Sequence, residues 1–120
     1  MTLAALTEKV KQVLEIKNLR IVGGELTEVS KVAVVGGSGS SYISLAAFKG
    51  AQCLITGDIK YHDAQDALQR NLCLIDAGHF ETERPVLASL SSKIATALQD
   101  IDNTVEIILS TSQNTPFTYM

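Results

Sequence analysis

Both histidines of the chain lie in two short polar clusters, and any metal or acid–base chemistry is expected there. The first cluster is TGDIKYHD (residues 56–63) and the second is DAGHFETE (76–83). Each directly follows a short apolar run, at residues 53–55 and 72–75. Because alternating β/α chains place ligand-binding groups just beyond the carboxyl ends of their strands, the two clusters are expected to share one site.

The most specific candidate pair in these clusters is His79 with Glu83. An imidazole nitrogen and a carboxylate oxygen are common ligands of Zn, Mn or Fe, and a spacing of four residues stacks the two side chains if the segment is helical. Pro85 favours a first helical turn and disfavours the α conformation at Arg84, so the helix is expected to begin near Arg84. The alternative is an exposed histidine beside a capping acid, since two ligands are fewer than a zinc site requires.

Other polar residues of the clusters could complete or orient this pair. Asp58, His62 and Asp63 could add ligands, or could accept the second N–H of a metal-bound imidazole. Alternatively, Asp58 is a helix N-cap and His62 a surface residue of the first helical turn. Asp76 either caps the next turn or faces the site. A histidine that does not bind metal could act in proton transfer, because the imidazole pKa is near neutral.

A glycine–serine loop at residues 36–41 follows a predicted strand and precedes a predicted helix. The backbone N–H groups around Gly37, Ser38 and Gly39 could bind a phosphate or another anion, although a tight turn explains the sequence equally well. Neither nucleotide-binding fingerprint is complete. Cys53 and Cys73 lie in apolar runs and are expected to be buried, inert thiols, so nucleophilic catalysis is not predicted.

Length and composition predict one soluble domain, residues 1–120. The net charge of −3 gives no electrostatic signature of nucleic-acid or membrane binding. The start of the chain lacks the pattern of a signal peptide, no apolar segment is long enough to span a bilayer, and the two cysteines suit a reducing compartment. The sequence therefore predicts a cytoplasmic protein.

The hydrophobic pattern alternates between helices and strands. Helices are expected at residues 3–16, 42–49, 61–70 and 84–99, and strands at 19–22, 31–35, 52–56, 72–76 and 105–109. This order predicts an α/β fold, a three-layer α/β/α sandwich around a mainly parallel sheet. The polar tail after residue 109 is expected to be either flexible or docked through Phe117 and Tyr119.

Four segments, in this order, resemble the carboxy-terminal half of the NIF-three-like family, also labelled GTP cyclohydrolase type 2 homologue. The segments are KVAVVGGSGSS (31–41), ITGDIKYHDA (55–64), LIDAGHFETERP (74–85) and NTPF (114–117). The resemblance implies one repeat of a fold with two similar α/β repeats around a dinuclear metal site, in a closed homo-oligomer. It also implies that His79 and Glu83 are metal ligands and that Asp58 and His62 line the same cleft.

The family's first repeat, which carries an adjacent histidine pair and an aspartate of the metal site, has no counterpart in this sequence. The resemblance thus implies half of a metal-dependent hydrolase acting on a phosphate-bearing small molecule, with an amino-terminal repeat as its partner. The resemblance implies that the chain is a fragment, a split protein or a shortened paralogue. The alternative function is a non-catalytic metal-binding scaffold. With two ligands, the isolated chain is expected to be inactive and to bind metal weakly.

Overall fold

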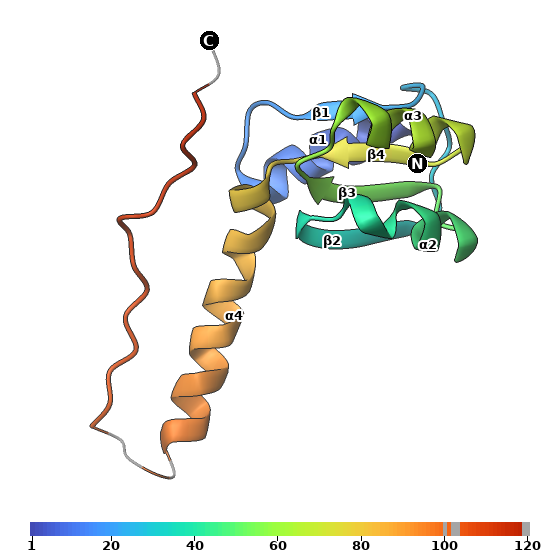
Figure 1. Cartoon of the computed structure of the whole chain (residues 1–120). Coiled ribbons are helices and arrows are strands. Elements are labelled where there is room, and N and C mark those ends of the chain that lie inside the picture. Colours follow the sequence, from blue (N-terminus) through green and yellow to red (C-terminus); the bar gives the residue numbers. More distant parts are fainter. Residues whose placement is uncertain (100, 102–103, 119–120) are drawn as a thin grey trace.

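The structure is a computed structural model that describes residues 1–99, 101 and 104–118. Its elements, labelled in Figure 1, are α1 (Leu3–Leu14), β1 (Arg20–Val22), β2 (Val32–Ser38), the 3-10 helix η1 (Ser40–Tyr42), α2 (Ile43–Phe48), β3 (Cys53–Gly57), α3 (Tyr61–Gln69), β4 (Cys73–Asp76) and α4 (His79–Gln99). Most bounds lie within a few residues of those predicted from the sequence.

Four strands form one sheet in the order β1-β4-β3-β2. β2, β3 and β4 run parallel, with Cys53 opposite Cys73, whereas β1 pairs antiparallel with β4 and places Arg20 opposite Asp76. The predicted mainly parallel sheet is confirmed. Its central strands β3 and β4 are buried along their whole length, as their continuous apolar sequences indicate.

Helices cover both faces of the sheet, which confirms the three-layer α/β/α architecture (Figure 1). Alternate residues of β3 point to opposite faces: Cys53 and Ile55 pack with α1, and Leu54 packs with α2 and α3. Both cysteines are buried free thiols, as predicted. Burial raises the pKa of Cys53 to about 12, with the nearby Cys73 thiol adding to the shift.

The last helix begins earlier than the sequence predicts. α4 starts at His79 rather than near Arg84, and Pro85 lies inside it. Because a proline lacks an N–H, Pro85 withholds the helical hydrogen bond normally offered to the carbonyl four residues earlier. The first turn is held by one local and one tertiary contact: the Thr82 hydroxyl donates to the Gly78 carbonyl four residues earlier (2.8 Å), and the Gly37 N–H of β2 donates to that hydroxyl (2.9 Å).

The predicted strand at residues 105–109 is wrong. Within the described residues, the segment after α4 is extended but pairs with no strand, because it runs beside α4 and away from both edges of the sheet (Figure 1). Phe117 is 67% exposed, and Tyr119 lies outside the described residues. No helix in the described part of the chain is long and apolar enough to cross a membrane.

Candidate functional site

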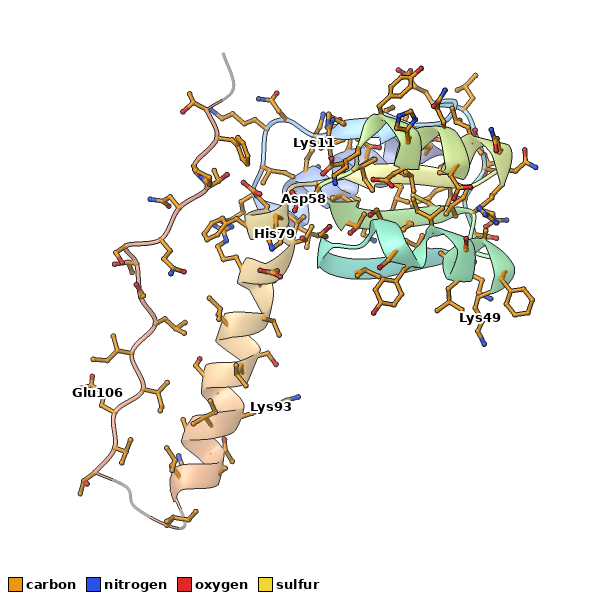
Figure 2. The ribbon with its side chains drawn as sticks, in the orientation of Figure 1. Lys11, Lys49, Asp58, His79, Lys93 and Glu106 are labelled. Atoms are coloured by element: carbon orange, nitrogen blue, oxygen red, sulfur yellow. The ribbon has the colours of Figure 1, made fainter. Side chains whose placement is uncertain are left out.

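The two polar clusters meet at the carboxyl ends of β3 and β4. Asp58 directly follows β3, and His79 opens α4 three residues after the end of β4 (Figure 2). Nδ1 of His79 donates to Oδ2 of Asp58 at 2.6 Å, and Nε2 of His79 lies 3.4 Å from Oε2 of Glu83 on the next turn of α4. The early start of α4 therefore places His79 and Glu83 on one helical face.

The electrostatics of this group follow from its hydrogen bonds. The bond to Asp58 is the main cause that raises the pKa of His79 above the ordinary value of 6.5, and it outweighs the lowering effect of desolvation. The Glu83 carboxylate adds to the rise. Because Nδ1 of His79 keeps its proton and donates it in the hydrogen bond to Asp58, a neutral His79 has a free lone pair on Nε2, the atom beside Glu83.

Two glycines allow the strand ends to approach the pair closely. A Cβ atom at Gly37, where φ is +66°, would lie 2.5 Å from Oε1 of Glu83 and 3.2 Å from Nε2 of His79. A Cβ atom at Gly57 would lie 2.6 Å from the backbone nitrogen of His79. Only glycine fits at these positions without displacing the site.

Threonine hydroxyls join the glycine–serine loop to this site. The Thr56 hydroxyl donates to the Gly37 carbonyl (2.9 Å), and Thr82 accepts the Gly37 N–H. The backbone polar groups of Gly37 are thus occupied by the protein itself. Sequence reasoning missed both threonines, although Thr56 lies in the first polar cluster and Thr82 in the second. The predicted anion contact of Gly37, Ser38 and Gly39 stays a prediction.

The buried Asp76 braces both loops of the site. One of its carboxylate oxygens accepts from Arg20 and from the Ile59 N–H (3.2 Å), and the other accepts from the Gly78 N–H (3.3 Å). The Arg20 guanidinium also donates to the Ile59 carbonyl (2.8 Å). Since these bonds fix the backbone beside both Asp58 and His79, Asp76 serves as a structural acceptor. Sequence reasoning did not identify its partner Arg20.

The remaining predicted residues make their contacts within the start of α3. His62 is exposed, with Nδ1 3.2 Å from Oε1 of Gln65 and its ring edge-on to Tyr61. Asp63 accepts the Lys60 N–H at 3.0 Å, which caps the helix. These contacts agree with the alternative of a surface histidine in a first helical turn, whereas Asp58 faces His79 and does not cap α3.

A cavity of about 820 Å³ opens beside Asp58 and His79. Its walls come from β1, the start of α4 and the tail, and they include Arg20, Phe80, Glu81, Pro116 and Phe117. This volume suits a small-molecule ligand. Within the described residues, however, no three or more His, Cys, Asp or Glu side chains are arranged to hold a metal ion. His79 and Glu83 are thus two candidate ligands, fewer than a zinc site requires.

Comparison with known proteins gives consistent matches along the chain. The sequence profile of the family described as Duf34/NIF3 (NGG1p interacting factor 3) matches residues 1–116. A protein of Clostridium acetobutylicum named GTP cyclohydrolase 1 type 2 homolog is 36% identical over 119 residues, 99% of this chain and 44% of the relative. A protein of the same name from Bacillus subtilis is 36% identical over 120 residues, 100% of this chain and 32% of the relative.

Solved structures agree with these matches. A Bacillus cereus protein related to NIF3 superposes with a TM-score of 0.94 and 38% identity, covering 100% of this chain and 33% of that protein. A Staphylococcus aureus protein gives a TM-score of 0.91 and 32% identity, covering 100% of this chain and 39% of that protein. The chain thus spans less than half the length of these relatives.

Proposed function

Because the chain belongs to the Duf34/NIF3 family, we propose that it supplies one wall of a dinuclear metal site in a metal-dependent hydrolase, with His79 and Glu83 as metal ligands. The observation that carries the proposal is the arrangement around His79, which has Asp58 on one ring nitrogen and Glu83 beside the other. The relatives' name, GTP cyclohydrolase 1 type 2 homolog, favours a nucleotide-like, phosphate-bearing substrate.

The residues present fit a divalent metal ion such as Zn, Mn or Fe. Imidazole nitrogen and carboxylate oxygen suit all three, and both side chains are about half exposed, so an ion can reach them. The missing Cβ of Gly37 leaves room beside both donor atoms. A carboxylate on the distal nitrogen of a metal-binding histidine fixes its tautomer and ring orientation, and Asp58 is placed to do this.

Each residue of the site has a defined task in this proposal. Two bound divalent ions would lower the pKa of a water molecule for attack on the substrate. Asp58 holds the proton on Nδ1 of His79, and Glu83 adds a negative oxygen on the same helical face. Asp76 and Arg20 hold the backbone of both loops in place. The adjoining cavity receives the substrate.

Calorimetric titration of the chain with zinc or manganese tests the ligand assignment. We expect weak binding, micromolar or weaker, because two ligands replace little of the metal's hydration shell. His79→Ala and Glu83→Ala should each abolish it, whereas the control His62→Ala should bind like the wild type. Unchanged binding in both site variants would show that the ligands are wrong. A tight stoichiometric complex of the unaltered chain would show that its site is already complete.

Catalysis needs a separate test on a protein with both repeats. We expect a metal-loaded two-repeat protein to hydrolyse a nucleotide substrate, and the His79→Ala and Glu83→Ala variants to lose at least two orders of magnitude in rate. Equal rates in the wild type and the variants would contradict the proposal of a metal-dependent hydrolase. The second candidate is a non-catalytic metal-binding scaffold, which the largely exposed α4 favours. Metal binding that depends on His79 without any turnover would support that function instead.

A further inference from the structure

The cavity beside the site contains a carboxylate that is not used by the protein itself. Asp58, Asp76 and Glu81 all line this cavity. Asp58 accepts a hydrogen bond from His79, and Asp76 accepts from Arg20. Glu81 is partly buried, yet within the described part of the chain its carboxylate takes part in no hydrogen bond or ion pair. Its acceptor oxygens are therefore left for a ligand.

The usual structural role of a glutamate at this position is taken by another residue. A glutamate at the third position of a helix commonly accepts the N–H of the residue just before the helix, which here is Gly78. The Glu81 carboxylate does fold back over Gly78, because a Cβ atom at Gly78 would meet Oε2 of Glu81. The Gly78 N–H, however, donates to Asp76 (3.3 Å). Glu81 thus lies at the helix start without capping it.

Glu81 is also badly placed to be a third ligand of the His79–Glu83 pair. Successive residues of an α-helix are about 100° apart, so Glu81 projects from α4 about 200° away from His79, whereas His79 and Glu83 share one face. No group of three such side chains in the described residues is arranged to hold a metal ion. The free carboxylate is therefore suited to the organic part of a ligand.

Apolar side chains surround this carboxylate in the cavity. Phe80, the neighbour of Glu81 in the sequence, is partly buried and lines the cavity, as do Leu19, Pro116 and Phe117. The faces of aromatic rings stack on planar bases whatever the base. The cavity thus combines a stacking surface with a polar group that fixes orientation, the combination typical of small-molecule sites.

The chemistry of the carboxylate defines the edge of the base that it can bind. An ionised carboxylate only accepts hydrogen bonds, and its two oxygens match two N–H donors that lie side by side. Guanine presents such a pair, N1–H and the 2-amino group, on one edge. Adenine instead has an acceptor at N1, which would face a carboxylate oxygen. Arg20, the one lysine or arginine among the described cavity residues, is bonded to Asp76 and does not neutralise Glu81.

We propose that Glu81 selects a guanine base in this cavity: its two carboxylate oxygens accept the N1–H and 2-amino donors while the ring stacks on Phe80. The proposal rests on the proposed function for a nucleotide as the ligand, and it adds the residue that determines which base is preferred. It assigns Glu81 a role in specificity that is separate from the metal ligands.

NMR titration of the whole chain with guanosine, inosine and adenosine monophosphates, in the presence of a chelator, tests the proposal. Inosine monophosphate keeps N1–H and lacks the 2-amino group. We expect guanosine monophosphate to bind roughly 10–100-fold more tightly than adenosine monophosphate, as for a bidentate contact to a base edge, with inosine monophosphate between them. Glu81→Gln replaces one acceptor oxygen by a donor, so it should lower this ratio at least about tenfold. Because the three ligands carry the same charge, loss of the charge of Glu81 alone does not change the ratio.

Two further variants control for other effects. Glu25→Gln makes the same chemical change at an exposed glutamate outside the cavity and should keep the wild-type ratio. Phe80→Leu should weaken all three ligands by a similar factor, because stacking does not read the base edge. Equal binding of the guanine and adenine nucleotides to the wild type would overturn the proposal. A wild-type ratio in Glu81→Gln, or no binding of guanosine monophosphate at millimolar concentration, would also overturn it.

The chelator makes the test independent of the metal site. A guanine preference that depends on Glu81 supports this proposal even if the zinc titration shows that His79 and Glu83 are not ligands. Conversely, a two-repeat protein that hydrolyses guanine and adenine nucleotides at equal rates, unchanged by Glu81→Gln, would overturn the role of Glu81 and leave the hydrolase standing.

Discussion

The two ends of α4 differ in their contacts with the rest of the chain. At its start, His79 and Thr82 contact the ends of β2 and β3, and glycines bring the backbones within side-chain distance. From residue 86 onwards most side chains of the same helix are exposed, among them Val86 (59%) and Leu90 (48%). The helix is therefore positioned by its first turns alone. A candidate site built on those turns is held by the sheet, whereas the remainder of the helix projects away from it (Figure 1).

The largest expected difference between these regions is in core energetics. Leu74 of β4 is fully buried and Leu90 in the outer part of α4 is half exposed. Leu74→Ala should lower the free energy of unfolding by about 2–5 kcal/mol because it leaves a cavity, whereas Leu90→Ala in the monomer should cost less than about 0.5 kcal/mol. Urea denaturation at low protein concentration measures both. An equal loss in the two variants would show that the outer part of α4 packs on the rest of the chain.

A glycine substitution sharpens the contrast at the site. An alanine Cβ at Gly57 would lie 2.6 Å from the His79 nitrogen and 2.7 Å from the Gly78 carbonyl carbon. Gly57→Ala should therefore destabilise the domain by about 1–3 kcal/mol and weaken metal binding by shifting His79. The control Gly24→Ala meets only a threonine hydroxyl, at 3.3 Å, and should be nearly neutral. Wild-type stability in Gly57→Ala would contradict the close approach seen here.

The buried aspartate gives a third, smaller effect. Asp76→Asn weakens the charged hydrogen bonds from Arg20 and Ile59, so we expect a loss of about 1–2 kcal/mol. The matched control is Asp66→Asn, which removes the charge of an exposed aspartate paired with Arg70 and should cost at most about 0.5 kcal/mol. Thermal unfolding distinguishes them. If both variants lose the same amount, Asp76 does not brace the site loops.

What the sequence predicts well is local. The continuous apolar runs before TGDIKYHD and DAGHFETE predict the bounds of β3 and β4 within one residue. Because both polar clusters follow the carboxyl ends of neighbouring strands, the sequence also predicts that His79 lies near Asp58. What it misses depends on distant partners: Arg20 and Asp76 are 56 residues apart, and Gly37 and Thr82 are 45 apart. The Thr82 contacts also explain why α4 starts before Pro85. Likewise, residues 105–109 have the sequence of a strand, but none of the strands in the described part of the chain pairs with them.

The smallest expected effect is the titration of His79, which tests whether the site is preformed. Asp58 raises the pKa of His79, so Asp58→Asn should move the NMR titration midpoint of His79 down towards 6.5. Asparagine tolerates the left-handed φ of +58° at this position, so the backbone is not strained.

Because the folded-state pKa of His79 is raised, the His79–Asp58 bond stabilises the fold fully below about pH 6.5, and this contribution disappears as the pH rises through the raised value. Stability of the wild type should accordingly exceed that of Asp58→Asn at acidic pH and converge with it at alkaline pH. His62, whose contact is with Gln65, serves as the internal control. An unchanged His79 midpoint in Asp58→Asn would mean that the His79–Asp58 pair does not form in solution and that the site at the start of α4 is not preformed.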